Sequence, residues 1–156
     1  MSEAIYSLRK CSHDDMEAII KLRVEFLKEA RLVKNKKDVN ELKNEIRDFV
    51  TEHLNKDLHF WFAEVENEAV AAGAVSIWDK LPVKAGSNYK VAYFSNMYTC
   101  PEYRKMGIAS SLMKHIFGFL KEEGVQKAML HALEDGKGVY KKLGFSSHEN
   151  LMEMEI

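Results

Sequence analysis

The residues best suited to chemistry lie in the stretch 104–110, where a predicted strand gives way to a predicted helix. Gly107 and Ala109 carry almost no side chain, and Arg104 adds a cation three residues before the glycine. The first amide N–H groups of a helix have no partner within it, and the helix dipole makes that end positive. Small residues let an anion touch these amides directly. The pattern therefore predicts a cradle for a phosphate or pyrophosphate group.

A second candidate is Tyr140, which opens the segment Tyr140-Lys-Lys-Leu-Gly144-Phe145. A phenol with a pKa of about 10 is protonated at neutral pH and can donate to a thiolate, whose thiol has a pKa of about 8.5. Tyr140 is thus a candidate acid for a sulfur leaving group. A tyrosine that only packs its ring is the alternative. Lys141 and Lys142 could contact a phosphate or form a solvated charge pair.

Together the two segments resemble the signature of the GCN5-related N-acetyltransferase (GNAT) family, most strongly over residues 92–145. The resemblance implies that acetyl-coenzyme A (acetyl-CoA) is the co-substrate and that the first segment holds its pyrophosphate. It also implies that Tyr140 protonates the departing thiolate and that an amide near Met97 polarises the thioester carbonyl. The cofactor-binding residues implied in this way are Met97, Tyr98, Thr99, Arg104, Lys105, Met106, Gly107, Ile108, Ala109 and Ser110.

Hydrophobic periodicity and turn residues predict the elements that must position these groups. The predicted strands are 5–11, 57–66, 69–78, 89–99, 125–132 and 146–156, and the predicted helices are 16–30, 39–54, 110–123 and 136–143. Asn67 and Glu68 are expected to form a tight turn, and Gly73 a bulge or a close backbone approach. The order βααβββαβαβ implies an α/β fold with a mixed, mostly antiparallel central sheet flanked by helices on both faces, as in the GNAT family.

Length and composition predict one globular domain, and the resemblance implies that it is a single N-acetyltransferase domain over residues 1–156. The 46% hydrophobic content supports a sizeable core, and the net charge of -1 argues against nucleic acid or membrane partners. Cys11 and Cys100 form no close-spaced pair, and the six histidines show no metal spacing, so we expect a cytoplasmic protein without a metal site.

The base that deprotonates an amine is not evident, because the central strand offers Ser95, Asn96 and Tyr98 but no acidic residue. Asn96 is the candidate to orient a water or the acceptor. Proton-acceptor candidates after the next strand are His131, Glu134 and Asp135. Cys100 could carry the acetyl group in a ping-pong reaction, but a buried thiol and direct transfer in a ternary complex are preferred.

The leading interpretation is an acetyl-CoA-dependent N-acetyltransferase that acts on a primary amine of a small molecule or peptide. The alternative is a non-catalytic module that binds acetyl-CoA or CoA. A P-loop or dinucleotide-binding protein is disfavoured because both glycine signatures are absent. The acceptor and the choice between monomer and homodimer stay open. The aromatic residues Phe60, Trp61, Phe62 and Trp78 could line an acceptor pocket, although core packing is the default.

Overall fold

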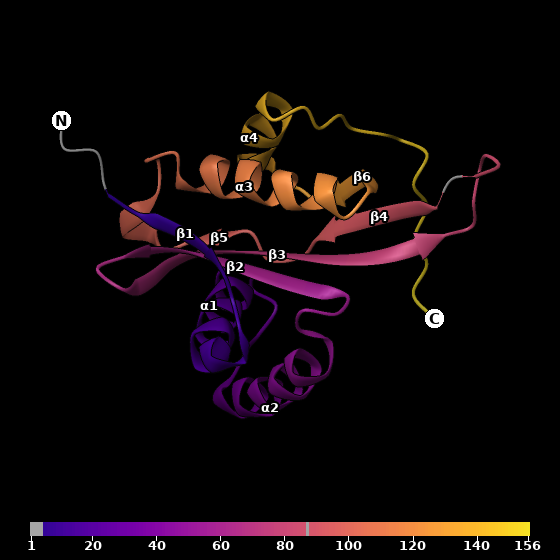
Figure 1. Cartoon of the computed structure of the whole chain (residues 1–156). Helices are drawn as coiled ribbons and strands as arrows, with labels where there is room; N and C mark the ends of the chain where they lie inside the picture. Colours follow the sequence, from indigo (N-terminus) through magenta and orange to yellow (C-terminus); the bar gives the residue numbers. More distant parts are fainter. Residues whose placement is uncertain (1–4, 87) are drawn as a thin grey trace.

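A twisted sheet forms the middle layer of the protein, as the computed structural model of residues 5–86 and 88–156 shows (Figure 1). Its strands lie in the order β1-β2-β3-β4-β6. The short strand β5 pairs with Ala71 and Ala72 of β3, next to the part of β3 that pairs with β4. All pairs are antiparallel except β4 with β6. The strands are β1 (Ser7–Lys10), β2 (Leu58–Val65), β3 (Glu68–Lys80), β4 (Tyr89–Phe94), β5 (Tyr98–Thr99) and β6 (Val125–Leu130).

Helices cover both faces of this sheet, which confirms the predicted fold class. Figure 1 shows α1 and α2 on one face and α3 and α4 on the other. The helices are α1 (Met16–Glu29), α2 (Lys36–His53), α3 (Ile108–Glu122) and α4 (Lys137–Lys142). Apolar residues of α3 recur at three- and four-residue steps, so one side of this helix is buried against the sheet.

Two hydrophobic clusters fill the spaces between the layers, one on each face of the sheet. Alternation along β2 sends Trp61 into the cluster with α3 and sends Phe60 and Phe62 into the cluster with α1 and α2. These three rings are buried core residues on opposite faces, so they cannot line one pocket together. Trp78, in contrast, is 42% exposed near the end of β3.

Three predicted elements differ from the structure. The two-residue turn between β2 and β3 is Glu66-Asn67, one position earlier than expected, and both residues have positive φ. The strand predicted over 89–99 is broken at 95–97. The prediction of a terminal strand over 146–156 was wrong, because this segment forms no strand. Leu151 and Met152 within it are 66% and 92% exposed. A segment with alternating apolar residues forms a strand only where the edge of a sheet is available for backbone hydrogen bonds.

Candidate active site

The break at residues 95–97 is a β-bulge, in which one strand carries an extra residue. Val75 pairs with Phe94, and Ala72 pairs with Tyr98. Two residues of β3 therefore face three residues between β4 and β5. Such an insertion bends the strand and changes which face the following side chains occupy.

The bulge lies where the parallel pairing of β4 with β6 ends. The pairing of β4 with β6 reaches Phe94 and Leu130, whereas β5 pairs with β3. The Cys100 amide donates to the Val70 carbonyl at 2.9 Å. Alternation along the strand then turns the backbone N–H and C=O groups of Thr99, and of Met97 before it, away from β3. No described strand pairs with β5 on that side, so these backbone groups have no partner in the sheet ladder.

Gly73 lies on β3 at the level of the bulge and makes this arrangement sterically feasible. A Cβ atom at Gly73 would lie 2.8 Å from Cδ1 of Ile116 on α3 and 3.1 Å from Sδ of Met97. The sequence predicted a bulge or a close backbone approach at this glycine, and the structure instead brings side chains close to it. The Met97 side chain packs against the cluster on the α3 side.

The turn before α3 leaves the first amide groups of the helix without a side-chain cap. Lys105 and Gly107 have φ of 61° and 77°, and Gly107 is the N-cap of the helix. The Ser111 amide donates to the Gly107 carbonyl at 3.0 Å. The amides of residues 108–110 precede this bond and, as the first N–H groups of a helix, have no intrahelical acceptor. Ile108 is 1% exposed, and its side chain packs into the cluster on the α3 side of the sheet.

The Arg104 side chain is directed away from these amides. Its Nη2 forms an ion pair with Glu29 at the end of α1 at 2.6 Å, and its Nε donates to the Thr99 carbonyl at 2.9 Å. The hydrogen bond that Arg104 donates to Glu29 raises the pKa of the guanidinium and lowers the pKa of the carboxyl. Arg104 also lies over the Tyr98 ring, which packs into the core on the α1 side. Lys105 and Met106 are exposed.

Asn96 lies within the bulge and is 1% exposed. Nη1 of Arg23, on α1, donates to the Asn96 Oδ1 at 3.3 Å and to the Ser95 carbonyl at 2.9 Å. The Asn96 Nδ2 is buried and has no partner among the described residues. Because buried donors are nearly always satisfied, this amide is suited to a group that a ligand supplies.

Tyr140 lies on the other face of the sheet, on α4. Its ring meets Phe145 edge to face, with centroids 6.0 Å apart, and lies close to Gly136, where a Cβ would be 3.0 Å from the ring. Burial raises the pKa of its phenol, which keeps it a proton donor at neutral pH. Its hydroxyl forms no hydrogen bond within the described part of the chain. Lys141 and Lys142 are exposed beside it.

Sequence reasoning missed a chain of polar contacts on the α1 side. The Tyr93 hydroxyl lies 2.6 Å from Nδ1 of His131, and Nε2 of His131 lies 2.9 Å from Oε1 of Glu153. The other candidates near His131 are not part of it, since Glu134 pairs with Lys137 and Asp135 is exposed. The sequence signal was available in part, because Phe94 and Leu130 both face α3 and their neighbours must share the opposite face.

The Cys100 thiol is ill suited to carry an acyl group. Burial, followed by the charges of Glu25 and Glu102, raises its pKa and so disfavours the thiolate. Among the described residues no group of three His, Cys, Asp or Glu side chains is placed to hold a metal ion, and no helix is long and apolar enough to cross a membrane.

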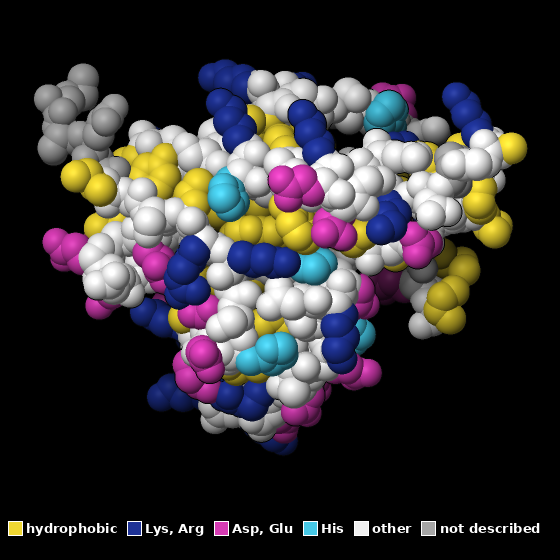
Figure 2. Space-filling model, in the orientation of Figure 1, with side chains coloured by type: hydrophobic (Ala, Val, Ile, Leu, Met, Phe, Trp, Pro, Cys, Tyr) yellow, Lys and Arg dark blue, Asp and Glu magenta, His cyan; other side chains and the backbone are white. Residues whose placement is uncertain are grey.

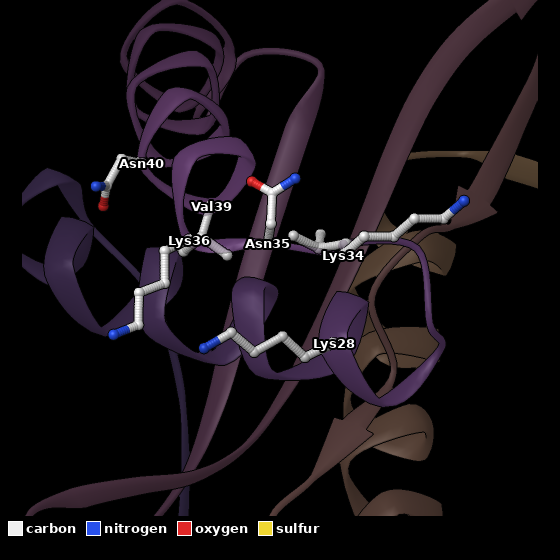
Figure 3. A pocket seen from close by; sticks show the side chains of 7 residues that line it. Lys28, Lys34, Asn35, Lys36, Val39 and Asn40 are labelled. Atoms are coloured by element: carbon white, nitrogen blue, oxygen red, sulfur yellow. The ribbon is translucent and has the colours of Figure 1, made fainter.

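A cavity of about 390 Å³ lies between the end of α1 and the start of α2, away from the residues above. Figure 3 shows Lys28 and Lys36 extending to the same side of it and Lys34 extending the other way. None of the predicted site residues lines this cavity. Positive and negative side chains are interspersed over the face in Figure 2. The predicted donor-binding residues therefore lie on β5 and at the start of α3, apart from this cavity.

The architecture matches several solved structures along nearly its whole length. An acetyltransferase structure with acetyl-CoA from Clostridium acetobutylicum is 27% identical, with 97% of this chain and 96% of that chain covered and a TM-score of 0.86. A GCN5-related N-acetyltransferase from Ralstonia eutropha is 23% identical, with 97% and 99% covered and a TM-score of 0.80. An aminoglycoside acetyltransferase from an uncultured soil sample is 15% identical, with 97% and 95% covered and a TM-score of 0.71.

The last two likenesses are those of fold. Among curated proteins, none matches the chain by sequence. The model of the acetyltransferase (GNAT) family, in contrast, matches residues 16–145, which include the bulge, the amide turn and Tyr140. Proteins of this family use acetyl-CoA, and the chain belongs to the acetyltransferase (GNAT) family.

Proposed function

We propose that this protein is an acetyl-CoA-dependent N-acetyltransferase that transfers the acetyl group directly to a primary amine of a small molecule or peptide. One observation carries the proposal. The bulge at 95–97 turns the backbone of Met97 toward the side of β5 that no described strand covers, and β5 leads into the uncapped amides at the start of α3. An extended amide-containing arm followed by a pyrophosphate has the chemistry to fit both features.

The residues that would hold the donor divide into backbone and side-chain contacts. Backbone groups of Met97 and Thr99 would bind the pantetheine arm, and the amides of residues 106–110 would bind the pyrophosphate. Tyr98, Ile108 and Arg104 contribute through position, because their side chains are engaged elsewhere. Bound acetyl-CoA supplies an activated acetyl group as a thioester. Tyr140 would protonate the thiolate, and the unpartnered Nδ2 of Asn96 would donate to a substrate group.

Direct transfer is favoured over a covalent acetyl-enzyme. Burial raises the pKa of the Cys100 thiol, which favours the protonated side chain at neutral pH, and the Cys100 amide donates to the Val70 carbonyl just beyond β5. A nucleophilic cysteine needs the opposite environment, with a nearby base or cation that favours the thiolate.

Acetyl-CoA binding is tested by thermal unfolding. A ligand at 100 times its Kd stabilises the folded state by about 2.7 kcal/mol. For a chain of this size each kcal/mol raises Tm by about 2–4 °C, so we expect a rise of roughly 5–10 °C. Thiol release with a panel of primary amines then tests transfer. Stabilisation without amine-dependent thiol release would favour the non-catalytic binding module instead.

Gly107→Glu, with Gly107→Ala as its matched control, locates the pyrophosphate. Both variants carry the strain of an L-residue at φ 77°, about 1–2 kcal/mol, but only glutamate adds bulk and negative charge beside the amides. We expect Gly107→Glu to abolish the acetyl-CoA stabilisation and Gly107→Ala to retain most of it. Equal responses of the two variants would place the pyrophosphate elsewhere.

A further inference from the structure

We propose that Tyr93, His131 and Glu153 form a relay that removes the proton from the attacking amine, with the Tyr93 hydroxyl as the group that touches the amine. The proposal rests on the acetyl transfer proposed above and assigns the base that the central strand lacks. His131 and Glu153 act through Tyr93 and orient it.

Three segments far apart in the sequence supply the relay. Tyr93 lies on β4, His131 directly follows β6, and Glu153 lies in the C-terminal segment. The phenol oxygen is 2.6 Å from Nδ1 of His131, and Nε2 of His131 is 2.9 Å from the Glu153 carboxylate. The rings of Tyr93 and His131 also meet edge to face, with centroids 5.6 Å apart. The parallel pairing of Phe94 with Leu130 holds the two elements side by side.

The contacts fix the direction of the relay. A carboxylate only accepts hydrogen bonds, so a neutral His131 must carry its proton on Nε2 and donate it to Glu153. Nδ1 is then an acceptor, and the Tyr93 hydroxyl donates to it. This leaves the lone pairs of the phenol oxygen for an N–H group of the amine. A histidine oriented by a carboxylate is a common arrangement for a base that acts through a hydroxyl.

Tyr93 lies beside the predicted reacting centre and not at a remote surface. Its neighbours Ala92 and Phe94 face α3, so Tyr93 faces α1. The charged groups that act on Tyr93 there are Arg23 from α1 and Glu153 from the C-terminal segment. The same Arg23 binds the Ser95 carbonyl and Asn96 within the bulge. Burial raises the pKa of the Tyr93 phenol, so it needs a partner such as His131 to take its proton.

The relay and the candidate acid lie on opposite faces of the sheet. Tyr140 packs into the cluster on the α3 side, and Tyr93 faces α1. As the amine nitrogen bonds to the acetyl carbon and the C–S bond breaks, the amine proton passes to the Tyr93 oxygen and the Tyr93 proton passes to Nδ1 of His131. Glu153 stabilises the resulting imidazolium, and the thiolate takes the Tyr140 proton. Charge and protons balance without another reactant.

Kinetics of Tyr93→Phe test the first step, with Tyr89→Phe as a matched control that removes a hydroxyl from the same strand. The assay follows acetyl-CoA thiol release with hydroxylamine, an amine that is largely neutral at pH 7. We expect kcat/KM to fall about 10²–10⁴-fold in Tyr93→Phe, and as much in His131→Gln. The double variant should lose no more than either single one, because the residues act as a unit. Tyr89→Phe should match the parent, and acetyl-CoA affinity should be unchanged throughout.

The pH profile separates a relay from a structural role. The activity of the parent, corrected for protonation of the amine itself, should fall at acidic pH, because a protonated imidazole cannot accept the Tyr93 proton, and Tyr93→Phe should lose that dependence. Additive losses in the double variant, or less than threefold loss in Tyr93→Phe, would overturn the proposal. Because the His131 side chain is exposed, His131→Gln should not disturb folding, and it tests the relay if Tyr93→Phe folds poorly.

¹⁵N spectra of the histidine rings test the relay without any substrate. We expect neutral His131 to hold its proton on Nε2 in the parent and to lose this preference in Glu153→Gln. His148, an exposed histidine outside the relay, should be unaffected by that change. A His131 proton on Nδ1 would overturn the relay even if acetyl transfer is confirmed. Correct spectra without any amine-dependent thiol release would instead refute the proposed function and, with it, the catalytic use of the relay.

Discussion

Replacing Gly73 with alanine should disturb the protein at the point where α3, β3 and the bulge meet. The added Cβ would lie 2.8 Å from Cδ1 of Ile116, 3.1 Å from Sδ of Met97 and 3.3 Å from Cδ2 of Leu112. Real Cβ atoms essentially never approach as closely as the first distance, so Ile116 must move. Ile116 and Leu112 are fully buried, and a close-packed interior has little room to accept them.

The size of the effect follows from two opposing terms. Overpacking a buried site costs about 1–3 kcal/mol, and replacing a strand glycine recovers about 0.5–1 kcal/mol of backbone entropy. The contacted atoms are ends of flexible side chains in a fully buried site, so we take the middle of this range, about 2 kcal/mol. We expect a net loss of about 1 kcal/mol and a fall in Tm of about 2–4 °C. Acetyl-CoA affinity should also fall, because Met97 must shift.

Thermal unfolding and acetyl-CoA titration measure both effects, and Gly118→Ala is the matched control. Gly118 lies exposed on α3 with nothing near its Cβ position, so alanine there should stabilise the protein by about 0.5–1 kcal/mol. Ile116→Val removes the closest atom and should therefore rescue part of the Gly73→Ala loss. A Gly73→Ala variant as stable as its parent, or strictly additive losses in the double variant, would refute this account of the bulge.

Three further variants test the site and its surroundings. Tyr140→Phe should lower kcat by about 10²–10⁴-fold in the thiol-release assay and leave acetyl-CoA affinity nearly unchanged by calorimetry, whereas a loss below threefold would make it a scaffold residue. Burial lowers the pKa of His59, so the folded state resists its protonation and stability should fall below pH 6.5 by up to about 1.4 kcal/mol per pH unit. Urea unfolding at pH 7.5 and 5.5 should show a smaller decline in His59→Phe. Glu29→Gln breaks an exposed ion pair and should cost below about 1 kcal/mol in urea unfolding, so a larger loss would mean that Arg104 depends on this contact.

Much of the fold could be predicted from the sequence because its elements have strong periodic patterns. The predicted start of α1 at Met16 and of β6 at Val125 agree with the structure. These signals are local, since each depends on residues within a few positions. The amide turn at Gly107 belongs to the same group.

The rest depended on contacts between distant segments. The extra residue in the bulge appears only when β4 and β5 are paired with β3, and a continuous apolar strand is the natural expectation without that pairing. Tyr93 and Glu153 are 60 positions apart, so no spacing rule connects them through His131. Arg104 was expected beside the anion, but no pattern in the sequence indicates that Glu29 would hold it.

In the proposed active site, the position of Arg104 would make the donor side and the α1 side energetically dependent on each other. Its guanidinium contacts Glu29 at the end of α1 and the Thr99 carbonyl on the donor strand, and its backbone enters the turn that precedes α3. A donor that changes the hydrogen bond at Thr99 on binding therefore changes the restraint on the end of α1. If this restraint changes the affinity for an acceptor that contacts α1, thermodynamic reciprocity requires the acceptor to change the affinity for the donor by the same factor. Cooperativity between the two substrates would follow from one side chain, without any rearrangement of the sheet.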